Sequence, residues 1–136
     1  MGFHEDFDCI IIWLNKRGYK VYMGSDAQDS VQYGPKRIYL NSRQHIQNRL
    51  YALLHECGHI LVNDNRDRVY KLSYQATGEG RVRPSKQKRV AILAEEFEAW
   101  KRGERLAARL GVEINIEKYD QERTKAIMSY VEWVDA

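Results

Sequence analysis

Residues 49–61 read RLYALLHECGHIL and contain the pattern His-Glu-x-x-His between His55 and His59. An apolar stripe at helical spacing predicts an amphipathic helix over about residues 42–65. The stripe consists of Leu50, Leu54, Cys57 and Leu61. Because residues four apart on a helix lie on the same face, the two imidazoles can converge on one metal ion.

Zinc is the cofactor that this pattern predicts. Zinc binds neutral imidazole nitrogen at about 2.0–2.1 Å and favours a tetrahedral set of ligands. Glu56 lies beside the histidine face, where its carboxylate can hold a zinc-bound water. Zinc lowers the pKa of that water towards about 7, so a neighbouring carboxylate can take its proton as general base. We therefore expect His55 and His59 as ligands and Glu56 as the catalytic residue.

A catalytic zinc site needs a third protein ligand and an open position. No histidine follows His59 in the sequence, so we expect a carboxylate from a later helix. Glu98 is the first candidate, because its small or anchoring neighbours would let two helices approach closely. These neighbours are Ala94, Phe97, Ala99 and Trp100. Glu95, one turn earlier, is the alternative, either as ligand or as a partner that orients a histidine.

The remaining elements predict an α+β fold. We expect an N-terminal helix over residues 5–17 with Gly18 as its stop, and a long helix from the N-cap Ser85 to Leu110 with Gly111 as C-cap. A last helix is expected over residues 121–134. Three short strands should form a small antiparallel sheet; they cover about residues 19–23, 30–33 and 37–40. We expect the third strand, Arg37 to Leu40, to be an edge that binds a substrate segment by strand addition.

Length and composition favour one globular domain over residues 1–136. The net charge of +3, from 22 basic and 19 acidic residues, does not by itself indicate nucleic-acid binding. Cys9 and Cys57 lack the spacing of a disulfide framework. The N-terminal residues are acidic, and the apolar run from Cys9 to Leu14 is too short to span a membrane. We therefore expect a cytoplasmic protein with reduced cysteines and no membrane contact.

Three segments together resemble the small gluzincins of the ImmA/IrrE type. They are RIYLN at 37–41, the helix at 49–59, and Glu96-Phe97-Glu98-Ala99. The resemblance implies a zincin-like fold and a zinc-dependent peptidase that cuts a protein substrate. In that family the glutamate directly before the alanine is the third ligand, which implies Glu98. The text Trp-Lys-Arg-Gly at 100–103 departs from the family pattern and would fit a divergent, phage-encoded branch.

Two other functions remain open from the sequence. The first is a non-catalytic, zinc-stabilised module that binds or regulates a protein, with Glu95 filling the water position. The second is a nucleic-acid-associated regulator that uses a basic run. That run consists of Arg81, Arg83, Lys86, Lys88 and Arg89. Tyr70 and Tyr74 are candidates for stabilising an oxyanion in a peptidase, and His45 is expected to lie at the surface.

Overall fold

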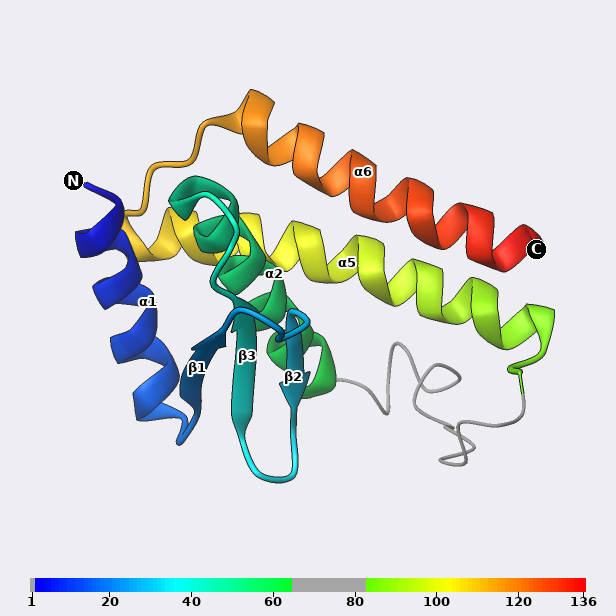
Figure 1. Ribbon diagram of the computed structural model, residues 1–136, viewed down its shortest axis with the longest axis horizontal. Coiled ribbons are helices and arrows are strands. Elements are labelled where there is room, and N and C mark those ends of the chain that lie inside the picture. The colour runs from blue at the N-terminus through cyan, green and yellow to red at the C-terminus, as the bar shows by residue number, and fades with distance from the viewer. Residues whose placement is uncertain (1, 65–82) are drawn as a thin grey trace.

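The computed structural model describes residues 2–64 and 83–136 of the chain. Within these ranges, the chain forms four helices and a three-stranded sheet (Figure 1). In chain order, the elements are α1 (Phe3–Lys16), β1 (Lys20–Gly24), β2 (Ser30–Gln32), β3 (Arg37–Asn41), α2 (Ile46–Asp64), α5 (Lys86–Leu110) and α6 (Ile116–Asp135). The α+β class is confirmed. No helix in the described ranges combines the length and apolar character needed to cross a membrane.

The sheet is mixed, so the prediction of an antiparallel sheet is wrong. Its strand order is β1-β3-β2, and β3 pairs parallel with β1 and antiparallel with β2. The prediction that Arg37 to Leu40 forms an edge is also wrong, because β3 lies in the centre. Ile38 and Leu40 of β3 are fully buried, so the strand with the best-covered apolar face takes the central place.

Local signals set the ends of the helices. The Ser85 side chain accepts a hydrogen bond from the Lys88 backbone N–H at the start of α5, and Gly111 ends that helix in the left-handed conformation with φ 74°. Both predicted caps are therefore confirmed. The last helix begins at Ile116, about one turn earlier than expected. Asn115 caps it by accepting a hydrogen bond from the Lys118 backbone N–H.

Helices α2 and α5 pack against each other with their backbones in direct contact. A Cβ added at Gly58 of α2 would lie 1.8 Å from the Ala99 carbonyl oxygen of α5. A Cβ added at Gly103 of α5 would lie 2.5 Å from the Leu54 carbonyl oxygen of α2. Two glycines, one on each helix, therefore permit an approach that a larger side chain would prevent.

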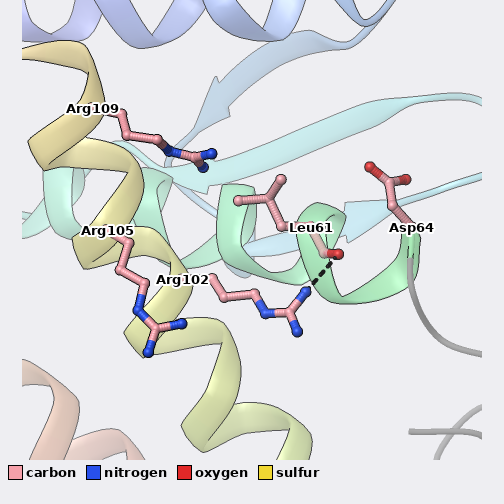
Figure 2. A pocket seen from close by; sticks show the side chains of 5 residues that line it. All are labelled: Leu61, Asp64, Arg102, Arg105 and Arg109. Atoms are coloured by element: carbon pink, nitrogen blue, oxygen red, sulfur yellow. Dashed lines mark hydrogen bonds between the residues drawn. The ribbon is translucent and has the colours of Figure 1, made fainter. Parts of the chain in front are cut away.

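A side-chain contact holds the C-terminal end of α2 against α5. Arg102 of α5 donates a hydrogen bond to the Leu61 carbonyl at 3.0 Å (Figure 2). This carbonyl belongs to the last turn of α2, where the carbonyl groups have no N–H partner within the helix. Arg105 and Arg109 lie farther along α5 and line the same hollow of about 440 Å³, together with Asp64.

Helix α6 lies along α5 and is tied down at both ends (Figure 1). At its start, the Tyr119 hydroxyl donates to the Trp100 carbonyl at 2.5 Å. At its end, Arg83 donates to the Trp133 and Ala136 carbonyls, and Arg89 donates to the Val134 carbonyl. Two members of the predicted basic run thus satisfy the C-terminal carbonyls of α6, and Arg81 lies outside the described residues.

We expect Gly58→Ala to destabilise the metal-free protein by about 3 kcal/mol or more, because the added methyl group meets backbone that cannot move aside. Chemical denaturation of the metal-free variant measures this change. Gly34→Ala is the matched control, since nothing lies within 4 Å of a Cβ built at Gly34. Equal free energies of unfolding for the two variants would contradict the close approach of the helices.

Candidate metal centre

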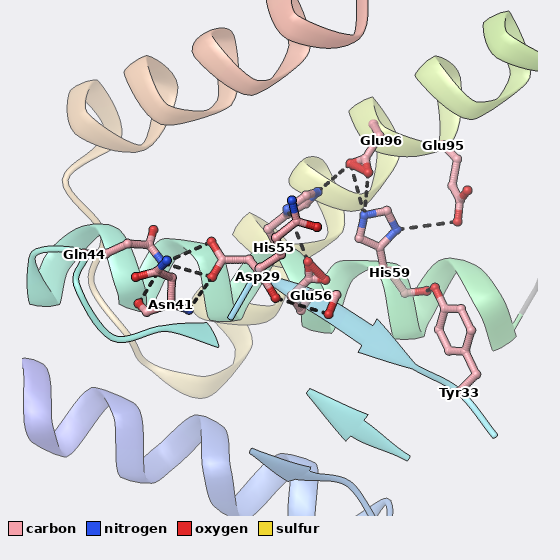
Figure 3. A network of polar contacts seen from close by, with 11 residues as sticks. Asp29, Tyr33, Asn41, Gln44, His55, Glu56, His59, Glu95 and Glu96 are labelled. Carbon is pink, nitrogen blue, oxygen red and sulfur yellow. Dashed lines mark hydrogen bonds and ion pairs between the residues drawn. The ribbon is translucent and has the colours of Figure 1, made fainter. Parts of the chain in front are cut away.

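The two histidines of the motif meet a single carboxylate from α5. His55 Nε2 lies 2.8 Å from Glu96 Oε2, and His59 Nε2 lies 3.0 Å from Glu96 Oε1 (Figure 3). One ligand atom from each of the three residues can be chosen so that all lie within 4.8 Å of one another. His59 and Glu96 are buried, and His55 is partly buried. Two imidazoles and a carboxylate form a donor set suited to zinc.

The structure places Glu96 at the histidines, where the sequence pointed to Glu98. Glu98 instead pairs with Arg102 at 3.0 Å and with Lys101 at 3.9 Å. The reason is the rotation of α5 about its axis. Ala99 and Trp100 are buried against α2, three and four residues after Glu96, so Glu96 shares their face. Phe97, expected to anchor the helix, is 48% exposed.

Neighbouring side chains hold both imidazoles in place. Glu95 Oε1 lies 3.5 Å from His59 Nδ1, the ring nitrogen that faces away from Glu96. This contact agrees with the expectation that Glu95 orients a histidine. The Trp100 ring stacks on the His55 ring, with centroids 4.2 Å apart and planes 10° apart. Carboxylate and aromatic contacts of this kind fix the ring orientation of a metal-binding histidine.

The charges of the centre are strongly coupled. Burial lowers the pKa of His59, but hydrogen bonds to Glu95 and Glu96 outweigh it and hold that pKa well above its ordinary value. For Glu96, burial raises the pKa, whereas the two histidines lower it more, and the net result is a pKa far below the usual range. The metal-free centre therefore holds a carboxylate against an imidazolium, and a cation is favoured at this position.

Glu56 lies at the wall of a cleft beside the histidines. Glu56 is only 4% exposed, and this burial is the main cause that raises the pKa of its carboxyl. The cleft has a volume of about 380 Å³, and His55, Glu56 and Glu96 line it. Asp29 lines the same cleft and is held by the Gln44 side-chain amide at 2.9 Å. A buried carboxylate with a raised pKa, beside a metal-type cluster, is typical of a general base.

Helix α6 supplies cleft residues that the sequence did not single out for function. Tyr130 lies in the lining with Glu56 and Glu96. Burial raises its pKa, and the neighbouring Glu96 adds to the shift. Tyr130 falls within the last helix predicted from the sequence, but helical periodicity cannot show which cavity a helix face borders. Tyr70 and Tyr74, the tyrosines singled out from the sequence, lie outside the described residues.

Two other residues take structural places. Cys57, which lies between His55 and His59 in the sequence, is fully buried. Burial raises the pKa of its thiol, so Cys57 is a packing residue rather than a nucleophile. His45 is exposed, as expected, and its Nδ1 accepts a hydrogen bond from the Gln47 backbone N–H near the start of α2.

Comparison with known families decides the identity of the domain. A family model described as "Peptidase_M78: IrrE N-terminal-like domain" matches residues 8–120. The chain belongs to this family. It is therefore a metallopeptidase domain, and the resemblance seen in the sequence is confirmed. A search of curated proteins and a search of solved structures found no match. The match covers the histidine motif and Glu96, and it ends near the start of α6.

In this M78 domain, we expect Glu96→Ala to weaken zinc binding more than a hundredfold, beyond the loss of about tenfold to a hundredfold that is usual for a residue outside the ligand set. Competition with a chromogenic chelator measures the affinity. Glu98→Ala is the matched control, because Glu98 lies two residues further along the same helix but pairs with Arg102, and this variant should bind zinc as the parent does. A greater loss of zinc affinity in the Glu98 variant would show that Glu98 is the third ligand instead.

Zinc binding to this M78 domain should weaken as the pH falls. The proton on His59 must leave before its nitrogen can bind a cation. Because the pKa of His59 is raised, this proton stays bound at pH values above 6.5, the ordinary pKa of histidine. Below the raised pKa, the apparent affinity should drop about tenfold per pH unit. Chelator competition between about pH 6 and about pH 8 measures the slope, and a flat profile would contradict the assigned protonation.

Proposed function

We propose that the chain is a zinc-dependent peptidase with a zincin-like fold, which hydrolyses peptide bonds of a protein substrate. The observation that carries the proposal is the convergence of His55, His59 and Glu96 beside the buried Glu56 at an open cleft. We further propose that residues 1–136 form one domain. The two free cysteines are consistent with a reducing, cytoplasmic compartment.

The donor set fits zinc rather than a harder ion. Both imidazoles present Nε2 to the same side, and the Glu96 carboxylate supplies an anionic oxygen. Magnesium and calcium prefer sites built mainly from oxygen, whereas zinc accepts nitrogen and oxygen in a tetrahedral set. His55, His59 and Glu96 would therefore hold Zn²⁺. When bound, zinc supplies polarisation of the peptide carbonyl and acidification of the attacking water.

Glu56 provides the proton transfers. Its carboxylate accepts a proton from the attacking water and then gives it to the nitrogen of the leaving amine. Burial supports this role, because a carboxylate with a raised pKa is a stronger base than an exposed one. The neighbouring His55 and His59 moderate that rise and help to keep Glu56 ionised.

The position of Glu95 supports an open site over the closed, non-catalytic alternative. A structural zinc site would need a fourth protein ligand. Glu95 contacts Nδ1 of His59, whereas Glu96 contacts Nε2 of the same ring, so Glu95 lies on the far side of the imidazole. From there it can orient His59 and leave the fourth position to water. Nucleic-acid binding stays a prediction, and Arg83 and Arg89, engaged at the end of α6, offer it little support.

The sheet supplies a place for the substrate backbone. Strand β2 lies at the edge of the sheet, and Asp29, directly before it, lines the cleft. We propose that an extended substrate segment pairs with β2. This proposal replaces the expectation that the substrate pairs with residues 37–40.

We expect Glu56→Gln to retain zinc and lose cleavage, by about a thousandfold or more, because the amide cannot accept the proton. Zinc-loaded protein is incubated with a denatured casein and with a mixed peptide library, and new termini are read by mass spectrometry. Glu122→Gln, another carboxylate of the cleft wall, is the control and should cleave as the parent does. Equal cleavage by the Glu56 variant and the parent would overturn the proposed role of Glu56.

A further inference from the structure

Helix α6 forms the wall of the cleft that faces the histidine helix α2. Ala126, Ser129 and Tyr130 of α6 line the cleft together with His55, Glu56 and Glu96. Contacts between α6 and α5 hold this wall in place, with Tyr119 and Arg89 fixing its two ends. The part of α6 that lines the cleft begins after residue 120, where the family match ends. The function of this wall is therefore not given by the family.

The cleft next to the metal cluster is rich in carboxylates. Glu56 and Glu96 line it directly, and Glu95 lies behind His59. During hydrolysis, negative charge develops on the oxygen of the scissile carbonyl. A hydrogen-bond donor is needed there, because nearby carboxylates would otherwise repel that charge.

Several side chains that line the described part of the cleft can donate a hydrogen bond, among them Lys125, Ser129 and Tyr130. Tyr130 is singled out by its contact with a residue of the metal cluster. It interacts directly with Glu96, so its hydroxyl lies next to the metal cluster. The Trp100 indole N–H is buried and out of reach of a ligand. Asn48 also lines the cleft but lies seven residues before His55 on α2, which places it about two helical turns away.

We propose that Tyr130 is a catalytic residue that donates a hydrogen bond to the carbonyl oxygen of the scissile peptide bond. The inference rests on the proposed peptidase function. Glu56 moves the proton, and Tyr130 stabilises the negative charge on the oxygen without changing its own protonation. Helix α6 thereby completes an active site whose other parts lie on α2 and α5.

Tyr130→Phe tests the assignment, because it removes only the hydroxyl. We expect kcat to fall about a hundredfold, the usual effect of removing one such donor, with KM and zinc affinity close to those of the parent. Ser129→Ala is the matched control, since it removes the neighbouring hydroxyl from the same wall and should leave kcat unchanged. Cleavage is followed with the best peptide found for the parent in the library.

Two results would overturn the inference. An unchanged kcat in Tyr130→Phe would show that the hydroxyl does not contact the reacting oxygen. A parallel loss of zinc affinity and kcat would show instead that Tyr130 holds the Glu96 ligand. Failure of the proposed function is distinct from both, because the zinc-loaded parent itself would then cleave no peptide.

Discussion

The contact between the backbones of α2 and α5 at Gly58 and Ala99 is the constraint on which the site depends. A Cβ at Gly58 would lie 1.8 Å from the Ala99 carbonyl oxygen, so only glycine permits this approach. Gly58 lies between Glu56 and His59 in sequence, and Ala99 follows Glu96 by three residues. The same contact that packs the helices therefore brings the Glu96 carboxylate within 3.0 Å of His59. The packing of α2 against α5 and the assembly of the metal ligands therefore depend on the same contact.

The local parts of this site could be predicted from sequence, because they depend on spacing within one helix. His55, Glu56 and His59 follow from the helical period, and the caps at Ser85 and Gly111 follow from backbone chemistry. The choice of Glu96 depends on how α5 is rotated against α2, which the sequence leaves ambiguous. Phe97 and Trp100 both look like core residues, yet only Trp100 is buried. The parallel pairing of β1 with β3 is likewise a non-local property.

Charge placement explains why basic residues near α5 need not indicate a nucleic-acid surface. Arg83 and Arg89 satisfy carbonyls at the end of α6, and Arg102 satisfies a carbonyl at the end of α2 while pairing with Glu98. Arginines at helix C-termini complement the helix dipole and stabilise the junctions between helices. Arg83 and Arg89 also hold α6 in place as a wall of the cleft, so a helix largely beyond the family match borders the candidate metal centre.

Anomalous diffraction at the zinc absorption edge, from crystals of the zinc-loaded protein, tests the ligand set most directly. We expect one strong peak at about 2.0–2.2 Å from His55 Nε2, His59 Nε2 and a Glu96 oxygen, with a water in the remaining position. Glu95 should contact His59 Nδ1 and stay off the metal. A peak bonded to Glu98, or a fourth protein ligand in place of the water, would contradict this ligand set.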